Sequence, residues 1–277
     1  TYIDIVDPKI TFLENSPQFV WQSEQDGYNH AYLYQYNAEK PERAELVRQI
    51  TQGYWEIAEL YGVDEEAEVL YYLSTENSPL ERYLYRIGLN GENRKQLTQQ
   101  VGWHQVTFST NYRFFIDHHS ALHTVPTYNL YTAENKLVRT LENNMELKER
   151  LKKYRLGRVE FIEVPLEDGQ YMNGYMIKPP GFDPEQRYPV LMFCYGGPGA
   201  QTVTNKFDPF NHFWFQHLAQ MGYIVVSVDN RGTGGRGADF KKCTYKQLGK
   251  LEHLDQAAAA RWLGTQNYVD RSRIGIW

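Results

Sequence analysis

The stretch Tyr188-Pro189-Val190-Leu191-Met192-Phe193-Cys194-Tyr195-Gly196-Gly197-Pro198-Gly199 is an apolar run that ends in a glycine-rich turn. A second apolar run, Tyr223 to Val228, also leads into a glycine-rich turn. Continuous apolar runs of this kind are typical of strands buried on both faces of a parallel sheet. Helical patterns follow the two runs, at Phe213 to Met221 and at Leu248 to Leu263. With a last strand at Arg273 to Trp277, this alternation predicts a doubly wound α/β sheet.

Two details of this region can be predicted further. Arg158 to Pro165 and Tyr171 to Lys178 alternate in polarity around Asp168-Gly169, so we expect a pair of strands joined by a tight turn. In the second helix, the apolar spacing predicts that Leu251, Leu254, Ala258 and Trp262 lie on one face.

The first 141 residues follow a different pattern, a weak repeat with a period typical of propeller blades, about 40 to 50 residues. Phe19 to Ser23 followed by Tyr32 to Tyr34 is echoed by Leu70 to Ser74 followed by Tyr83 to Tyr85. A weaker third echo consists of Phe114 to Ile116 and Asn129 to Tyr131. Turn signals such as Asp26-Gly27 and Asn90-Gly91 separate short alternating strands, which predicts four-stranded antiparallel blades. About three blades are part of a ring of 4 to 8, so we expect more blades before Thr1.

Composition excludes several other classes of protein. The net charge of −5 is not concentrated in a long block of either sign, which argues against a nucleic-acid or anionic-lipid partner. The apolar runs are far shorter than the roughly 20 residues of a membrane span. Two cysteines, Cys194 and Cys243, cannot make a disulfide framework or a zinc site by themselves. The chain lacks an initial Met and ends just after an apolar run, so we expect it to be an interior piece of a longer parent protein.

Tyr195 is the candidate catalytic residue. The loop Tyr195 to Gly199 lies where α/β-hydrolases place a glycine-rich loop that supplies an oxyanion donor. Such a donor must lie about 3 Å from the developing negative charge, and a tyrosine hydroxyl can do this. The alternative is an ordinary turn in which Tyr195 is only a packing aromatic.

Four other motifs receive structural interpretations. Gly232 to Gly237 fits a dinucleotide-binding pattern, but the required acidic residue is missing from a second strand, so we interpret it as tight turns. Asp117-His118-His119 with His123 lacks further metal ligands, and we expect solvated loop histidines. Glu65-Glu66 is predicted to be a turn between blade strands, with binding of a substrate amine as the alternative. Cys194 is expected to pack as a small hydrophobe.

The order of these parts resembles the dipeptidyl peptidase IV-like serine peptidases of the prolyl oligopeptidase clan. The resemblance covers the whole chain, including Asp26-Gly27-Tyr28 with His30, Trp55-Glu56, Tyr195 to Gly199, Val228 to Gly234 and Arg273 to Trp277. It implies C-terminal blades of a β-propeller at residues 1–141 and a linker helix at 142–157. Residues 158–277 would be the N-terminal half of an α/β-hydrolase domain, cut before the nucleophile elbow.

The resemblance also implies an activity for the parent. A serine exopeptidase would release X-Pro or X-Ala dipeptides from the amino terminus of a peptide substrate, with no metal or organic cofactor. Tyr195 matches the oxyanion tyrosine, and Asp229 to Gly232 matches a scaffold turn. The triad serine, aspartate and histidine would follow Trp277, so the isolated chain is expected to be inactive, and the family's paired glutamates would precede Thr1.

Further expectations and alternatives remain open at this point. The parent is expected to form a homodimer and to be periplasmic or otherwise extracytoplasmic. An acylaminoacyl peptidase or oligopeptidase of the same clan is the close alternative. A non-catalytic propeller interaction protein is the alternative from another class.

Overall fold

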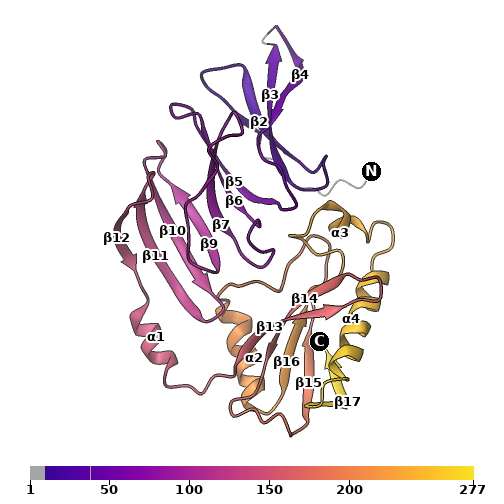
Figure 1. Ribbon diagram of the computed structural model, residues 1–277. Helices are drawn as coiled ribbons and strands as arrows, with labels where there is room; N and C mark the ends of the chain where they lie inside the picture. Colours follow the sequence, from indigo (N-terminus) through magenta and orange to yellow (C-terminus); the bar gives the residue numbers. More distant parts are fainter. Residues whose placement is uncertain (1–9, 38) are drawn as a thin grey trace. The chain divides into compact units, whose positions relative to one another are not determined.

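The computed structural model describes residues 10–37 and 39–277, so residues 1–9 of the first expected domain lie outside the described residues (Figure 1). The chain divides into two compact units. Unit 1 comprises Thr1–Asn143 together with Gly235–Asp239. Unit 2 comprises Asn144–Gly234 and Phe240–Trp277. Among the described residues, no helix is long and apolar enough to cross a membrane.

Unit 1 contains three four-stranded antiparallel sheets, each with its strands in sequence order, which confirms the predicted propeller blades. The first blade is made of β1 (Thr11–Phe12), β2 (Gln18–Ser23), β3 (His30–Asn37) and β4 (Lys40–Gln49). The second is made of β5 (Ile57–Asp64), β6 (Val69–Ser74), β7 (Tyr83–Gly88) and β8 (Lys95–Gln96). The third is made of β9 (Trp103–Phe108), β10 (Phe114–Ala121), β11 (Thr124–Thr132) and β12 (Leu137–Glu142).

The second blade buries both of its faces, because successive side chains of a strand point to opposite sides of the sheet. In β6, Leu70 and Tyr72 belong to a buried cluster that includes Val20 and Leu33 of the first blade. The intervening residues of β6 belong to a different cluster, which they share with side chains of the third blade. Members of that cluster are Tyr71, Leu73, Leu84, Leu97, Val106 and Phe115. Aromatic and β-branched residues on alternating positions therefore stack the blades.

The segment Gly235–Asp239 packs within unit 1 although it lies far along the chain. Glu56 accepts a hydrogen bond from the Gly237 N–H at 2.9 Å, and Gly27 O accepts one from the Ala238 N–H at 2.8 Å. A Cβ atom at Gly237 would lie 2.8 Å from the Tyr28 ring. Two stretches that carry the family resemblance, Asp26 to Tyr28 and Trp55-Glu56, thus hold this segment.

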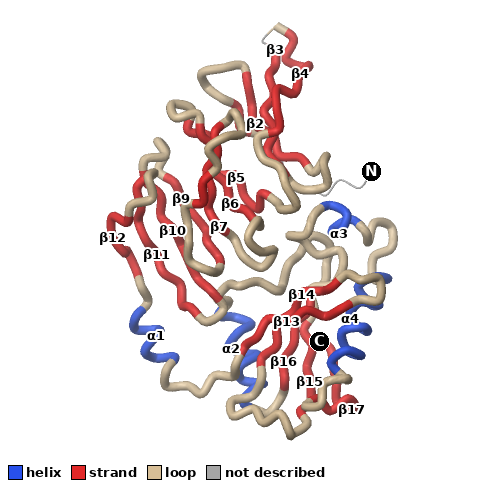
Figure 2. Tube along the Cα trace, in the orientation of Figure 1, coloured by secondary structure: helices blue, strands red, loops and turns tan. Residues whose placement is uncertain are grey.

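Unit 2 is built on a five-stranded mixed sheet with the order β13-β14-β16-β15-β17 (Figure 2). The strands are β13 (Val159–Pro165), β14 (Tyr171–Ile177), β15 (Tyr188–Phe193), β16 (Ile224–Val228) and β17 (Val269–Ile276). As expected, β13 and β14 form an antiparallel hairpin around Asp168-Gly169. β15 is parallel to both β16 and β17, whereas β14 is antiparallel to β16.

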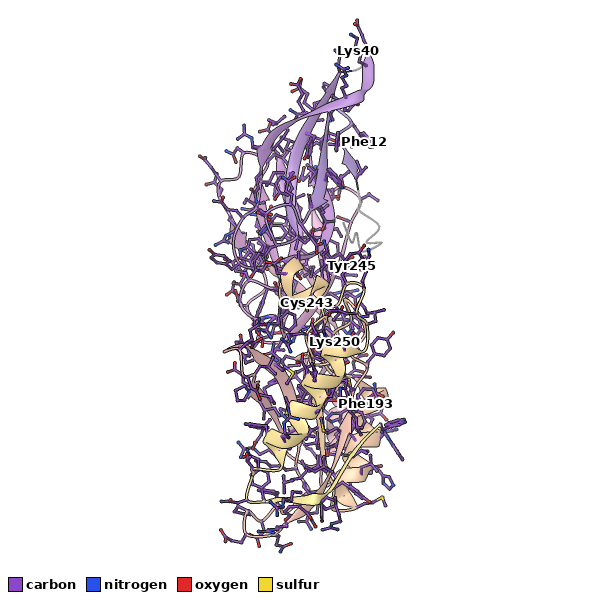
Figure 3. All side chains as sticks on the ribbon, turned by 90° about the vertical axis from the view of Figure 1, so that its right-hand side faces the viewer. Phe12, Lys40, Phe193, Cys243, Tyr245 and Lys250 are labelled. Carbon is purple, nitrogen blue, oxygen red and sulfur yellow. The ribbon has the colours of Figure 1, made fainter. Side chains whose placement is uncertain are left out.

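Two helices cover the two faces of this sheet. In β15, Met192 packs in a cluster with Ala259 and Leu263 of α4 (Lys250–Leu263). The next side chain points to the other face, where the Phe193 ring lies 5.2 Å from Phe215 of α2 (Pro209–Gln220). The sheet core is therefore enclosed on both sides, as in a doubly wound domain. Figure 3 labels Phe193 and Lys250, at the end of β15 and the start of α4.

The apolar face of α4 is not its most buried face, although Trp262 on that face packs against the sheet core. The buried residues of α4 are Asp255, Gln256, Ala259 and Leu263, whereas Leu254 is exposed. Asp255 and Gln256 face inward and bond backbone groups at the end of β16 and in the turn that follows it. α1 (Met145–Leu151) lies in the region of the expected linker helix and contains no buried residue. The short helix α3 (Ala238–Lys242) was not predicted.

Candidate functional site

The candidate site lies at the carboxyl ends of the parallel strands of unit 2. The Trp277 N–H donates to Met192 O at 2.9 Å, and the Cys194 N–H donates to Trp277 O at 3.2 Å. The ends of β15 and β17 are therefore joined directly. The residues after β16 reach the same place, because the Asn230 side chain bonds the loop that follows β15. Ligand sites of open α/β sheets form at this edge, outside the carboxyl ends of the strands.

Tyr195 leaves this edge toward solvent. Its side chain is 72% exposed, so it is not part of a packed interior. The backbone turns immediately after it, at Gly196, where φ is +64°. A Cβ atom at Gly197 would lie only 2.9 Å from Tyr195 Cε1, so the aromatic ring rests against the Gly197 backbone. One side of the Tyr195 ring thus packs against the backbone, and the hydroxyl is accessible to a ligand.

The loop after Tyr195 packs against the loop after β16. The Gly199 N–H donates to Gly232 O at 2.8 Å, and the Gly234 N–H donates to Ala200 O at 3.1 Å. A Cβ atom at Gly234 would lie 2.6 Å from Gly199 O, so the two backbones meet without side chains between them. The interpretation of Gly232 to Gly237 as tight turns agrees with positive φ values at three of its glycines.

Asp229 anchors the later part of the loop that follows β15. Its carboxylate is 6% exposed and accepts the backbone N–H groups of Thr202 and Val203, each at 2.9 Å. Burial raises the pKa of Asp229 to about 6, and the two N–H donors oppose that rise. The side chain therefore acts as an anchor for backbone donors, with its hydrogen bonds directed into the protein.

Arg231 ties the same turn to α4. Its guanidinium and backbone N–H donate to both carboxylate oxygens of Asp255, at 2.6 to 3.1 Å. The side chain also reaches Asp168 at 3.1 Å. Asp255 is only 1% exposed, so this bidentate partner supplies the hydrogen bonds that its buried carboxylate cannot receive from water. The turn after β16 is thus attached to its surroundings at three consecutive positions, Asp229, Asn230 and Arg231.

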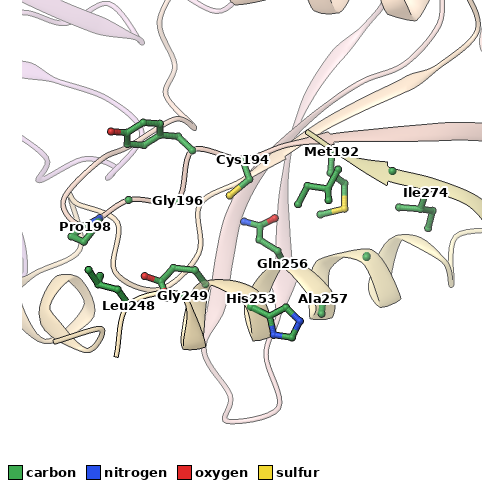
Figure 4. Close-up of a pocket in the computed structure, with 16 residues that line it drawn as sticks. Met192, Cys194, Gly196, Pro198, Leu248, Gly249, His253, Gln256, Ala257 and Ile274 are labelled. Atoms are coloured by element: carbon green, nitrogen blue, oxygen red, sulfur yellow. The ribbon is translucent and has the colours of Figure 1, made fainter. Parts of the chain in front are cut away.

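A cavity of about 630 Å³ lies beside the Tyr195 loop in unit 2. Figure 4 shows that its wall includes Cys194 and that Gln256 extends from α4 toward it. The lining is mostly apolar, with Met192, Pro198, Leu248, Ala257, Ala260 and Ile274 among its residues. Cys194 is half-buried, its thiol is directed to Asn230 Oδ1 at 3.5 Å, and burial raises its pKa. Such a thiol is a poor nucleophile, in agreement with a packing role.

The histidine motif of the third blade is not a solvated loop, and that prediction is wrong for all but His123. Asp117 and His119 face the same buried side of β10, because residues two apart in a strand share a face. Asp117 accepts from His104 Nδ1 at 2.9 Å, and His119 Nε2 lies 3.0 Å from Val101 O. Within the described residues, no group of three His, Cys, Asp or Glu side chains could hold a metal ion.

The other acidic motif lies in the turn between β5 and β6, as predicted for Glu65-Glu66. The Glu65 carboxylate accepts the backbone N–H groups of Glu14 and Asn15, at 2.6 and 2.9 Å, and these bonds lower its pKa. It also accepts from the Asn15 side chain at 3.0 Å. Both of its oxygens thus already accept hydrogen bonds from the segment between β1 and β2.

No individual role was predicted for Asn230 from the sequence. Its side chain bonds Gln256, and the neighbouring Arg231 bonds Asp255. A polar residue directly after a buried strand is a weak signal, since most such residues are solvated. Only the packing of α4 shows that these side chains are buried and bonded to the Tyr195 loop and the Asp229 to Gly232 turn.

Comparison with known proteins agrees with this architecture. Residues 1–126 match the dipeptidyl peptidase IV (DPP IV) N-terminal region, and residues 209–277 match the prolyl oligopeptidase family. A crystal structure of Porphyromonas gingivalis dipeptidyl peptidase 4 is 40% identical with a TM-score of 0.88, covering 97% of this chain and 37% of that one. A putative dipeptidyl aminopeptidase IV from Bacteroides ovatus is 28% identical with a TM-score of 0.82, covering 96% of this chain and 40% of that one.

Curated relatives give the same result. A probable dipeptidyl peptidase 4 of Aspergillus flavus is 33% identical over 259 residues, which are 92% of this chain and 33% of the relative. The chain spans about a third of the length of such relatives. Fold and matches show that the chain is similar to propeller-bearing members of the prolyl oligopeptidase family. More particularly, the chain matches a dipeptidyl peptidase IV N-terminal region followed by a prolyl oligopeptidase segment, and the relatives that it resembles are named dipeptidyl peptidase 4. The resemblance found in the sequence is confirmed.

Proposed function

We propose that this chain is the middle part of a serine exopeptidase that releases X-Pro or X-Ala dipeptides from the amino terminus of peptides. The observation that carries the proposal is the exposed Tyr195 side chain at the carboxyl end of β15, beside the end of β17. A serine that follows β17 would lie at this same sheet edge, because both strands run in parallel. The names of the homologues support a dipeptide product.

The chemistry follows from that placement. The serine hydroxyl attacks the carbonyl carbon after the second substrate residue, and a histidine accepts the hydroxyl proton and passes it to the leaving amine. The carbonyl oxygen becomes an oxyanion, to which the Tyr195 hydroxyl donates a hydrogen bond. Water then hydrolyses the acyl-enzyme in the reverse sequence of proton transfers. We place the serine, aspartate and histidine in sequence that follows Trp277.

The experiment is a substrate panel on the parent protein and on the 277-residue chain. We expect the parent to release p-nitroaniline from Gly-Pro and Gly-Ala anilides, and the isolated chain to release none. Preference for an N-acylated substrate would indicate an acylaminoacyl peptidase instead, and cleavage of internally placed Pro bonds an oligopeptidase. A parent that cleaves nothing, with a residue other than serine in the elbow, would support the interaction-protein alternative.

Two further properties of the parent are part of the proposal and rest on the resemblance. We propose a homodimer, which sedimentation of the parent would test, since a monomeric mass at micromolar concentration would contradict it. We also propose an extracytoplasmic location, which fractionation of the source cells would test.

A further inference from the structure

We infer that Asn230 is a positioning residue for the oxyanion tyrosine: its buried side-chain amide fixes the turn at Gly196 and so sets the direction in which Tyr195 leaves the loop. The inference rests on the proposed function of Tyr195. Asn230 does not touch the reacting atoms in this scheme and acts only through its neighbours in the loop.

The side chain of Asn230 uses its full hydrogen-bonding capacity. It is 0% exposed, and its Nδ2 group donates to Gly196 O at 3.1 Å and to Arg231 O at 2.8 Å. Its Oδ1 atom accepts from Gln256 Nε2 at 3.1 Å and from the Cys194 thiol at 3.5 Å. A carboxamide has two N–H donors and one oxygen with two lone pairs, and each of these has a partner here.

These partners also fix which way the amide points. Gly196 O and Arg231 O can only accept hydrogen bonds, so Nδ2 must face them. Gln256 is itself fixed in place, because its Nε2 group also donates to Val228 O at 2.9 Å. Gln256 is 8% exposed on α4, so this support comes from the packed side of the domain. Rotation of the Asn230 amide would break hydrogen bonds at both ends.

The Gly196 turn is shaped around this amide. A Cβ atom at Gly196 would lie 2.5 Å from Asn230 Oδ1 and 2.9 Å from Cys194 Sγ, so the backbone has closed onto both groups. Because the peptide bond is planar, holding Gly196 O also holds the peptide plane that leads to Gly197. The Tyr195 ring rests on Gly197. Asn230 thereby fixes the backbone of Gly196 and Gly197, against which the Tyr195 ring packs.

The size of the effect follows from the exposure of Tyr195. At 72% exposure the ring has few contacts that could restore its direction once the turn relaxes. A misplacement of about 1 Å at a catalytic group costs roughly 10²-fold in rate. We therefore expect Asn230→Ala in the parent to lower kcat by about 10- to 100-fold, with little change in KM.

The matched control is Gln216→Ala, which removes another buried side-chain amide bonded to a glycine backbone. Gln216 is 2% exposed and bonds both the N–H and the carbonyl of Gly157, at 2.6 and 3.1 Å. It lies on α2, so its loss destabilises the same unit without touching the Tyr195 loop. We expect a lower unfolding temperature for both variants, but a kcat within about twofold of wild type only for Gln216→Ala.

A double-mutant cycle separates positioning from general damage. In a Tyr195→Phe background, the donor that Asn230 positions is gone, so Asn230→Ala should lower kcat by less than about threefold. An undiminished fall in that background would overturn the inference. If Asn230→Ala does not fold, Gln256→Leu removes the supporting donor while leaving Asn230 in place, and the same non-additivity with Tyr195→Phe is expected.

A second readout does not depend on activity. With 3-fluorotyrosine incorporated into the parent, the ¹⁹F signal of residue 195, assigned by its loss in Tyr195→Phe, should shift or broaden in Asn230→Ala but not in Gln216→Ala. An unchanged signal would refute the inference even if the parent proved to have no peptidase activity. Absence of activity together with the expected ¹⁹F change would refute the proposed function and leave the role of Asn230 in the loop intact.

Discussion

A methyl group added at Gly196 should disrupt the turn beneath Tyr195. Two costs combine in Gly196→Ala: the φ value of +64° places Ala in the left-handed region, and the new Cβ would lie 2.5 Å from Asn230 Oδ1. The first cost is roughly 1 to 2 kcal/mol. The second forces the amide to move, and two lost hydrogen bonds at roughly 0.5 to 1.5 kcal/mol each add about 1 to 3 kcal/mol.

Two other glycines of unit 2 separate these costs. Gly169 has a φ of +84° but nothing within 4 Å of an added Cβ, so Gly169→Ala should show only the backbone cost. Gly275 has neither a positive φ nor a neighbour within 4 Å, so Gly275→Ala should be nearly neutral. Urea unfolding of the parent and its three variants measures the differences. The reasoning is refuted if Gly196→Ala is no more destabilising than Gly169→Ala.

Two further predictions concern the anchors of the site. Because burial raises the pKa of Asp229 from 3.8 to about 6, the folded state retains a proton that the unfolded state has released between these values. This group therefore makes the protein more stable by about 1 kcal/mol at pH 5 than at pH 7, and Asp229→Asn should remove that contribution from the pH dependence of thermal unfolding. A steeper dependence in the variant would contradict it. Asp255→Ala should destabilise by about 2 to 4 kcal/mol, since it leaves Arg231 without its buried partner. Asp270, whose side chain is 25% exposed in its ion pair with Arg273, offers a control whose replacement should lower the unfolding midpoint less. Equal shifts for Asp255→Ala and Asp270→Ala would show that the Arg231 pair is not a structural anchor.

Local patterns were sufficient to predict most of the fold. Strand alternation and turn residues act over a few positions, so the three blades and the hairpin at Asp168-Gly169 could be found from the sequence. The buried run Ile224 to Val228 likewise needs no distant partner to be recognised as a central strand. These elements depend on periodicity, which the sequence contains directly.

Features that depend on distant partners could not be predicted in the same way. The burial of Asp255 and Gln256 on α4 could not be predicted, because it depends on hydrogen bonds to a turn about 25 residues earlier. In β10, Asp117 and His119 were expected in solvent because the His104 partner on β9 is visible only in the register of the third blade. Tyr195 could be proposed as an oxyanion donor from its loop, whereas the contacts of Asn230 are visible only in the packed structure.

The most direct test of the account is kcat for Gly-Pro p-nitroanilide in the parent carrying Tyr195→Phe. Removal of one oxyanion donor should lower kcat by about 10²-fold or more while KM changes little. Tyr154→Phe provides the control, since Tyr154 is also exposed, at 63%, and has no proposed role. A kcat for Tyr195→Phe equal to that of Tyr154→Phe and wild type would contradict the role of Tyr195 as oxyanion donor.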